Sequence, residues 1–215
     1  MGNAPTAQAR QSFATLNSFD RQFVNNLSQA IRRRFTFITV NIPDKRPGSV
    51  AWTNTSAPVP LALQEYSVVM ERAAGRVAKR LTTLDTSKTA GMLKGIREQL
   101  MGPLAPLMVN LFDLVERVRY AGPDQKIPHL PIGTAQIIDT LELFILRVMQ
   151  DDAANTEAGS VLDWAVSVKI VPHFDSDVVA PEALKEFAAM LMPPFDKYTK
   201  REFLNILAAG MHFVE

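Results

Sequence analysis

The sequence predicts a mainly α-helical protein in which a short strand–helix–strand segment precedes an all-helical domain. Three observations support this fold class. Residues 12–42 pass from a strand-like pattern to a helical one and back, residues 43–60 hold four prolines, and apolar residues recur at helical spacing from Leu61 onward. We therefore expect three parts: an α/β remnant at 1–42, a linker at 43–60 and a helical domain at 61–215.

The first part combines two strand-like runs with a helix between them. Residues 12–16 form a short apolar run, and residues 35–42 are rich in β-branched and aromatic side chains. The helical pattern between them is carried by Phe23, Val24, Leu27, Ala30 and Ile31. This order is typical of a parallel β-α-β unit. Because parallel sheets are buried on both faces, two strands alone are unstable, and we expect residues 1–42 to be the truncated C-terminal remnant of a larger core.

The first helices of the second part are separated by a clear break. Apolar spacing predicts a long helix over 61–81 and two further helices over 92–101 and 104–118. A Gly-Pro pair lies between the last two, and proline cannot continue a helix because it lacks an N–H donor. A loop over 121–133 follows.

Capping signals predict where the remaining helices begin. Thr134 is the expected N-cap of the next helix. Residues 160–163 (Ser-Val-Leu-Asp) and residues 199–202 (Thr-Lys-Arg-Glu) match capping boxes, so each is expected to open a helix. Pro181 is expected as the first residue of the helix between them, a position where its missing N–H costs nothing.

The composition argues against a disordered, membrane-spanning or disulfide-bonded protein and indicates a cellular compartment. Hydrophobic residues make up 47% and charged residues 21% of the 215 residues, a balance that favours a packed core over disorder. No apolar run reaches the roughly 18 residues that a membrane-spanning helix needs, and no signal-peptide pattern opens the chain. With no cysteine, disulfide and thiolate chemistry are excluded, and we expect a cytoplasmic protein without a membrane partner.

Charge is distributed unevenly along the chain. Residues 1–42 hold five arginines against one acid, a local charge of +4, and since the whole chain carries +1 the remainder carries −3. A small basic segment beside a mildly acidic body indicates local binding of an anion. A surface that coats nucleic acid would instead have a domain pI above about 9, so we expect any contact with nucleic acid to be indirect.

The chemistry is expected where an asparagine ends the first strand and three arginines end the following helix. Asn17 would lie at the carboxyl edge of a parallel sheet, where such sheets bind ligands, and its amide can orient an attacking water. Arg32, Arg33 and Arg34 point about 100° apart, so no more than two of them can reach the same target. A guanidinium brought to a phosphate from a neighbouring subunit neutralises charge that develops in the transition state.

This stretch resembles the sensor-1 and arginine-finger segment of AAA+ ATPases, closest to the McrB-like and MoxR-like branch. Members of that branch carry a strand that ends in Met-Asn-x-x-Asp-Arg, and then a helix that ends in Leu-Arg-Arg-Arg-Phe. The matching residues here are Leu16-Asn17-Ser18-Phe19-Asp20-Arg21 and Ile31-Arg32-Arg33-Arg34-Phe35. The resemblance implies that Asn17 is the sensor-1 residue, with Asp20 and Arg21 beside it on the nucleotide side.

The resemblance also implies an arginine finger that acts in trans within a ring of subunits, usually a homo-hexamer. The sequence departs from the family pattern in two ways: Leu16 replaces Met, and the intervening helix is slightly longer than usual. The second departure leaves the finger open among the three arginines, and the pattern favours Arg33, then Arg34, over Arg32. A nuclease or another effector subunit is the partner that the restriction branch implies.

Looser similarity extends into the helical part. Residues 131–139 fall where the helical lid of the family carries its sensor-2 region, and residues 162–172 resemble a later lid helix. No arginine lies between His129 and Leu143, so no sensor-2 arginine is assigned. The resemblance therefore implies a β-α-β remnant of an AAA+ core followed by an all-helical lid domain.

Two parts of a complete nucleotide site are missing from this sequence. No glycine-rich loop leads into a Lys-Ser/Thr pair, as a phosphate-binding loop requires. No apolar strand ends in paired acids that could hold magnesium. ATP or GTP with Mg²⁺ would therefore bind only in the context of the full motor, and we expect the chain alone to be inactive.

Two other interpretations compete for parts of the chain. His173, Asp175 and Asp177 could ligate a metal, but three candidates on one loop favour a solvated loop, and no metal site is assigned. The alternative function is that of a non-enzymatic helical interaction module, whose basic N-terminal helix binds an acidic partner or nucleic acid.

Overall fold

The computed structural model describes residues 61–83, 85–121, 127–150, 157–174 and 179–211. The chain divides into two units, Met1–Asn41 and Ile42–Glu215, and all described residues belong to the second. The predictions for residues 1–42 and 43–60, the β-α-β remnant included, lie outside the described residues. They stay predictions.

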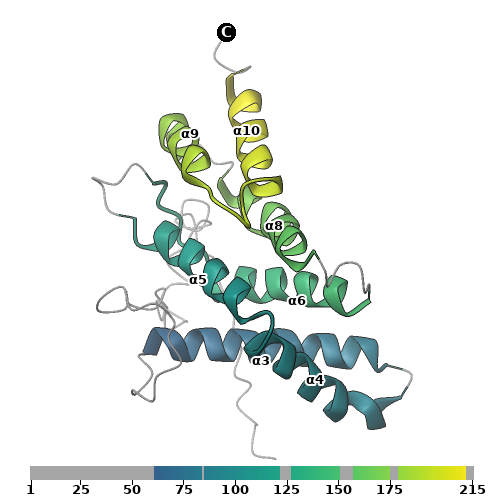
Figure 1. Cartoon of the computed structure of the whole chain (residues 1–215). Coiled ribbons are helices and arrows are strands. Elements are labelled where there is room, and N and C mark those ends of the chain that lie inside the picture. Colours follow the sequence, from purple (N-terminus) through teal and green to yellow (C-terminus); the bar gives the residue numbers. More distant parts are fainter. Residues whose placement is uncertain (1–60, 84, 122–126, 151–156, 175–178, 212–215) are drawn as a thin grey trace, which may run out of the picture. The chain divides into compact units, whose positions relative to one another are not determined.

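The described part consists of α-helices and two short 3-10 helices, with no strand among its residues (Figure 1). In chain order these are α3 (Leu61–Leu81), η2 (Thr86–Lys88), α4 (Thr89–Met101), α5 (Ala105–Arg119), α6 (Thr134–Gln150), α8 (Ala158–Lys169), η3 (Val171–Phe174), α9 (Pro181–Met190) and α10 (Tyr198–Met211). The mainly helical fold class is confirmed for these residues.

The long helix α3 has the bounds that its apolar spacing predicts. Tyr66, Val69, Ala73 and Val77 recur every three or four residues, and all four are buried. The helix packs against α4 and α6, and the ring of Tyr66 stacks on Phe112 of α5. Because fully burying a side chain such as Val contributes about 1.5–3 kcal/mol, this one face accounts for much of the attachment of α3.

The predicted break between α4 and α5 is confirmed. Gly102 follows the last residue of α4 with non-helical dihedral angles (φ −109°, ψ −106°), and Pro103 comes directly after it. The start of α4 differs, because the helix begins at Thr89 rather than at Met92. Its first turn follows η2 without interruption, and the carboxylate of Asp85 caps η2 by accepting a backbone hydrogen bond.

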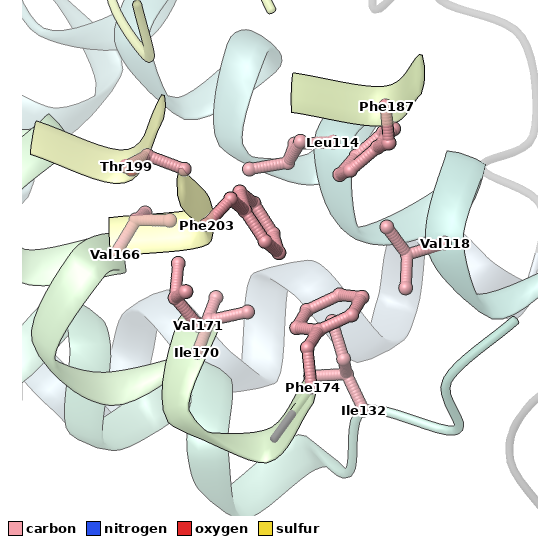
Figure 2. A pocket seen from close by; sticks show the side chains of 10 residues that line it. All are labelled: Leu114, Val118, Ile132, Val166, Ile170, Val171, Phe174, Phe187, Thr199 and Phe203. Atoms are coloured by element: carbon pink, nitrogen blue, oxygen red, sulfur yellow. The ribbon is translucent and has the colours of Figure 1, made fainter. Parts of the chain in front are cut away.

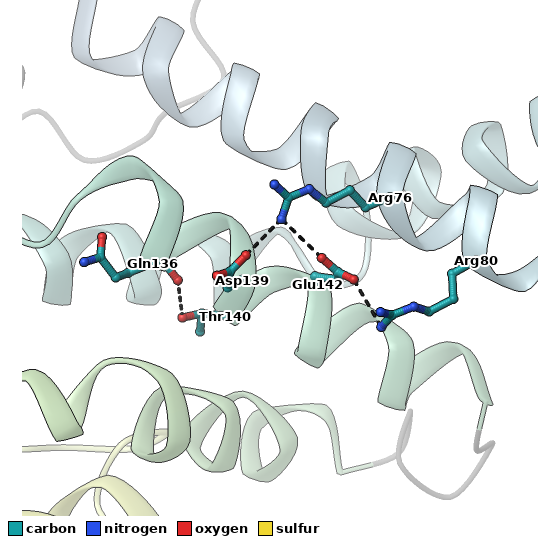
Figure 3. Close-up of polar contacts among 6 residues, drawn as sticks. All are labelled: Arg76, Arg80, Gln136, Asp139, Thr140 and Glu142. Carbon is teal, nitrogen blue, oxygen red and sulfur yellow. Dashed lines mark hydrogen bonds and ion pairs between the residues drawn. The ribbon is translucent and has the colours of Figure 1, made fainter. Parts of the chain in front are cut away.

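The core runs from α3 through α6 and α8 to α10. In α6 the buried residues are Ile137, Ile138, Thr140, Leu141, Phe144, Ile145 and Val148. The only polar member, Thr140, donates its hydroxyl hydrogen to the backbone carbonyl of Gln136 at 2.7 Å (Figure 3). That bond satisfies a buried polar group within its own helix, so α6 packs as an apolar element against α3 and α8.

The predicted capping boxes are wrong. Helix α8 begins at Ala158, before Ser160, and Asp163 lies in its interior. Helix α10 begins at Tyr198, so Thr199 is already helical. Asp163 and Thr199 bond to each other's segment of the chain, 36 positions away, rather than to the backbone of their own helix start, which the spacing of a capping box does not reveal.

The start of α6 is also displaced from its prediction by one position. Thr134 is the first helical residue rather than the N-cap, and the carbonyl of Gly133 accepts the N–H of Ile137. Pro181, in contrast, is the first residue of α9, as predicted. Proline fits there because that position has no intrahelical acceptor for an N–H group.

Helices α9 and α10 pack against each other, and α10 also packs on α8 and η3. Phe203 of α10 makes edge-to-face contacts with Phe174 of η3 and Phe187 of α9, with ring centroids 5.0 and 5.6 Å apart. Such aromatic pairs contribute about 0.5–1.5 kcal/mol beyond the area they bury. The three rings therefore form the centre of the C-terminal part of the fold.

Candidate functional site

The residues predicted for the nucleotide site lie outside the described residues. They are Asn17, Asp20, Arg21, Arg32, Arg33 and Arg34. Their roles and mutual arrangement stay predictions. Of the three candidate metal ligands, only His173 is described, and it lies exposed in η3. The polar sites that the structure describes belong to the helical domain.

The side chain of Arg119, at the end of α5, is completely enclosed. Its Nη1 and Nη2 donate to the carboxylate of Glu65 at 2.8 and 3.0 Å, and its Nε donates to the backbone carbonyl of Ile132 at 2.7 Å. Burial acts to lower the pKa of Arg119, but the hydrogen bonds and charge of Glu65 outweigh it, and the pKa is raised. The guanidinium is therefore a permanent buried cation.

Glu65 joins three helices at one point. Its carboxylate, on α3, binds Arg119 of α5 and also accepts the hydroxyl hydrogen of Thr134, the first residue of α6, at 2.6 Å. An anion beside the N-terminus of a helix is favoured by the helix dipole and by the N–H groups that lack intrahelical partners. The start of α6 is thereby fixed to both α3 and α5.

The sequence does not predict this junction, because no arginine lies between His129 and Leu143, where a sensor-2 arginine is expected. The segment 131–139, which resembles a sensor-2 region, does have an arginine bound to it, but that arginine is Arg119 from the preceding helix. One feature of the sequence does indicate that Arg119 is buried: it lies on the apolar face of α5, directly after the buried Val118. Because its side chain is completely enclosed and bonds to Glu65 and Ile132, Arg119 anchors the fold and does not face a ligand.

A second buried polar contact lies beside the first. The hydroxyl of Tyr66 donates to the carboxylate of Glu116 at 2.9 Å, and its ring stacks on Phe112 with centroids 3.9 Å apart. Burial raises the pKa of Tyr66 far above its ordinary value of 10, and the negative charge of Glu116 raises it further. The phenol therefore stays neutral and keeps its proton as a hydrogen-bond donor.

Ion pairs join α3 and α6 on the outer surface (Figure 3). Arg76 lies 2.9 Å from Asp139 and 3.4 Å from Glu142, and Arg80 lies 3.2 Å from the same Glu142. Both arginine side chains are more than half exposed, at 52% and 64%. Exposed pairs contribute at most about 1 kcal/mol each, so these contacts align the two helices rather than hold them together.

Asp163 of α8 is a fully buried carboxylate that caps a different helix. It accepts the backbone N–H groups of Lys197, Tyr198 and Thr199 at 3.2, 2.6 and 2.8 Å. The hydroxyl of Thr199 returns a hydrogen bond to the backbone carbonyl of Asp163 at 3.1 Å. These N–H groups begin α10 and have no intrahelical acceptor, so α8 supplies the cap that the sequence of α10 lacks.

A small pocket lies where α5, α8, η3, α9 and α10 meet (Figure 2). It is lined by Leu114, Val118, Ile132, Val166, Ile170, Val171, Phe174, Phe187, Thr199 and Phe203. None of these side chains is charged, and the space among them is about 10 Å³, no more than one water needs, so the pocket holds no acid, base or nucleophile pair and is too small for a ligand. Across the described ranges no three His, Cys, Asp or Glu side chains gather into a metal site, and no helix there is long and apolar enough to cross a membrane.

Comparisons with protein-family models, with curated proteins and with solved structures find no match to this chain. Two sets of residues indicate a function: the Asn-and-arginine segment of the N-terminal part and the junction of α3, α5 and α6 in the helical domain.

Proposed function

We propose that this chain is the nucleotide-sensing and coupling part of an AAA+ NTPase, and that it supplies an arginine finger in trans within a ring of subunits. The observation that carries the proposal is the paired motif: Asn17-Ser-Phe-Asp-Arg21 after one strand-like run, and Arg32-Arg33-Arg34 before the next. The helical fold of the described residues supports it, because the McrB-like and MoxR-like branch that the motif resembles has a helical lid after this segment.

Each residue of the motif has a role that its chemistry suits. The amide of Asn17 can donate to a phosphate and accept from a water, so it orients the attacking water, with Asp20 and Arg21 on the nucleotide side. The guanidinium of Arg33, or of Arg34, neutralises the charge that develops on the phosphate of the neighbouring subunit. The substrate is ATP or GTP with Mg²⁺, and the phosphate-binding loop and the magnesium-binding acids come from residues outside this sequence.

The helical domain has the coupling role in this proposal. The buried contacts of Glu65 with Arg119 and Thr134 tie the start of α6 to two other helices. The segment 131–139, which resembles a sensor-2 region, contains that start. Because α3, α5 and α6 are joined in this way, they move as one body, so a change at the nucleotide is passed on through them to the next subunit.

To test the proposal, the phosphate-binding half of an McrB-like motor is fused upstream of Met1. Phosphate release by the fusion protein is then measured with ATP and with GTP. Arg33→Ala or Arg34→Ala is expected to lower turnover about 10³-fold, the loss typical of a missing arginine finger. Arg117→Ala is the matched control, because this arginine is exposed on α5, where it pairs with its neighbour Asp113. If both finger variants keep full turnover, the finger assignment is wrong.

Mixed rings test whether the arginine acts in trans. Subunits that carry Asn17→Ala and subunits that carry the finger variant are each expected to be inactive alone. In a mixture, some interfaces combine an intact Asn17 with an intact arginine from the neighbour, so part of the activity should return. If mixing restores nothing, a trans-acting finger is excluded.

The alternative is a helical interaction module that binds an acidic partner or nucleic acid. The observation that favours it is the local charge of +4 in residues 1–42. Binding of oligonucleotides by the isolated chain, with an affinity that falls steeply as salt is raised, would favour this module over the motor. If the chain does not bind oligonucleotides even at low salt, the nucleic-acid form of the alternative is excluded.

A further inference from the structure

The described helices form two groups that differ in how they are attached. Helix α6 packs against α3 and α8, and α4 packs against α3 and α5. Helix α9 packs mainly on α10, and α10 packs on α9, α8 and η3. Neither α9 nor α10 has an extensive contact with α3, α4 or α6. The pair α9–α10 is therefore held to the rest through one side.

The apolar contact that α9 and α10 make with α5 and η3, which we call the seam, is almost completely closed. On one side of the seam lie Leu114 and Val118 of α5. On the other side lie Phe187 of α9 and Phe203 of α10 (Figure 2). All four side chains are buried, and the space left among them is about 10 Å³, no more than one water needs. The pair α9–α10 therefore differs from the other helices in having few partner helices, not in being loosely packed.

The strongest polar link across the boundary between α8 and α10 is Asp163. Its carboxylate holds three backbone N–H groups at the start of α10, and Thr199 donates a further bond back to its carbonyl. Hydrogen bonds to a charged group are stronger than neutral ones. When α10 separates from α8, all four bonds break together, so this residue can act as a latch.

We propose that α9 and α10 open from α8 as one cooperative unit, in a step that requires less free energy than global unfolding, and that Asp163 is the latch that keeps the unit closed. Proteins open in such contiguous units when a segment has few partners beyond one face. Opening exposes Phe187 and Phe203 together with Phe174, which gives the open state an apolar surface that the closed state hides. The inference is independent of the proposed function.

Hydrogen exchange of the full chain, followed by mass spectrometry, tests the proposal. In the wild type the amides of α9 and α10 are expected to exchange at one common rate, faster than those of α3 and α6. Asp163→Asn, which keeps an acceptor oxygen but loses the charge, should raise exchange in α9 and α10 about tenfold and leave α3 and α6 unchanged. Asp113→Asn, an exposed acid on α5, is the matched control and should change neither group.

Two results would overturn the proposal. One is equal protection of α9–α10 and of α3 and α6 in the wild type. The other is an Asp163→Asn variant in which exchange rises equally in every helix, because that would place Asp163 in the global fold rather than at a separate boundary. If the variant does not fold, exchange of the wild type in low urea still tests the proposal. Urea should accelerate exchange of α9–α10 less than exchange of α3 and α6, since a partial opening exposes less surface than global unfolding.

Discussion

Glu65 and Arg119 form a bidentate ion pair. The Arg119 side chain is completely buried and the Glu65 side chain is only 10% exposed. The pair links α3 to α5, and the Nε of Arg119 donates to the backbone carbonyl of Ile132. A buried ion pair can add little net stability, yet removing one partner leaves an uncompensated charge in the core. Its effect is therefore on which helices meet and in what register.

We predict that Glu65→Leu and Arg119→Met each lower the free energy of unfolding by about 3–5 kcal/mol, and that the double variant loses less than either single one. Each single change leaves the opposite charge buried without its partner, whereas the double change replaces both charged groups by apolar groups of similar size. Urea unfolding followed by circular dichroism measures all three. An equivalent cycle on Asp113 and Arg117, an exposed pair on α5, should give less than about 1 kcal/mol of coupling. Strictly additive losses at Glu65 and Arg119 would contradict the prediction.

The buried phenol of Tyr66 predicts a specific sensitivity to alkali. Its pKa is raised in the folded protein by burial and by Glu116, so the folded state keeps a proton that the unfolded state loses above pH 10. This contribution to stability is complete below pH 10 and decreases above it, by up to about 1.4 kcal/mol per pH unit. Tyr66→Phe should remove that part of the decrease between pH 9 and pH 11, while lowering stability modestly at pH 7 through the lost hydrogen bond to Glu116.

Unfolding free energies at pH 8 and pH 10.5, for wild type and Tyr66→Phe, measure this effect. Tyr120→Phe is a useful comparison, because burial also raises the pKa of Tyr120 and its removal should reduce the alkaline loss too. If the pH dependence above pH 9 is the same in Tyr66→Phe as in the wild type, Tyr66 does not control it.

The sequence predicts those parts of the fold that depend on neighbouring residues. The bounds of α3 follow from its apolar period, the break before α5 follows from Gly102 and Pro103, and the start of α9 follows from Pro181. Each of these signals acts within one or two helical turns. The same local reasoning fails for Asp163, because Ser160-x-x-Asp163 has the spacing of a capping box even inside a helix.

The polar sites could not be predicted because their partners are far apart in the chain. Asp163 and Tyr198 are separated by 35 positions, and Glu65 and Arg119 by 54. Without the packing of the helices, a buried arginine looks like an ordinary cation at a helix C-terminus, where it complements the dipole. Asn17 and the three arginines pose a harder problem still, since the proposed site requires a nucleotide and a second subunit.

The exposed contact between Arg97 of α4 and Glu71 of α3 predicts a weak sensitivity to acid. Hydrogen bonding from Arg97 lowers the pKa of Glu71, so this carboxylate stabilises the fold above its unfolded pKa of about 4.3 and stops doing so as the pH falls through its lower folded value. Arg97→Ala should therefore reduce the melting temperature slightly at pH 7 in low salt. The difference from wild type should shrink at 1 M NaCl and also below pH 4. A large loss that salt does not change would mean that Arg97 acts through packing instead.

Two glycines inside helices predict stabilising substitutions. A Cβ atom built at Gly75 of α3 or at Gly91 of α4 meets no heavy atom within 4 Å, so alanine fits there without rearrangement. Gly75→Ala and Gly91→Ala should each raise the free energy of unfolding by about 0.5–1 kcal/mol, because glycine loses more backbone entropy than alanine in a helix.

Gly102→Ala is the matched control for these two substitutions. There a Cβ would lie 2.8 Å from the backbone carbonyl oxygen of Glu98, and the backbone at the end of α4 cannot give way as a side chain could. This variant should therefore lose stability in the same urea titration that shows a gain for Gly75→Ala. If Gly75→Ala is the less stable variant, the outer face of α3 is not open at this position, and a contact that needs glycine must lie against it.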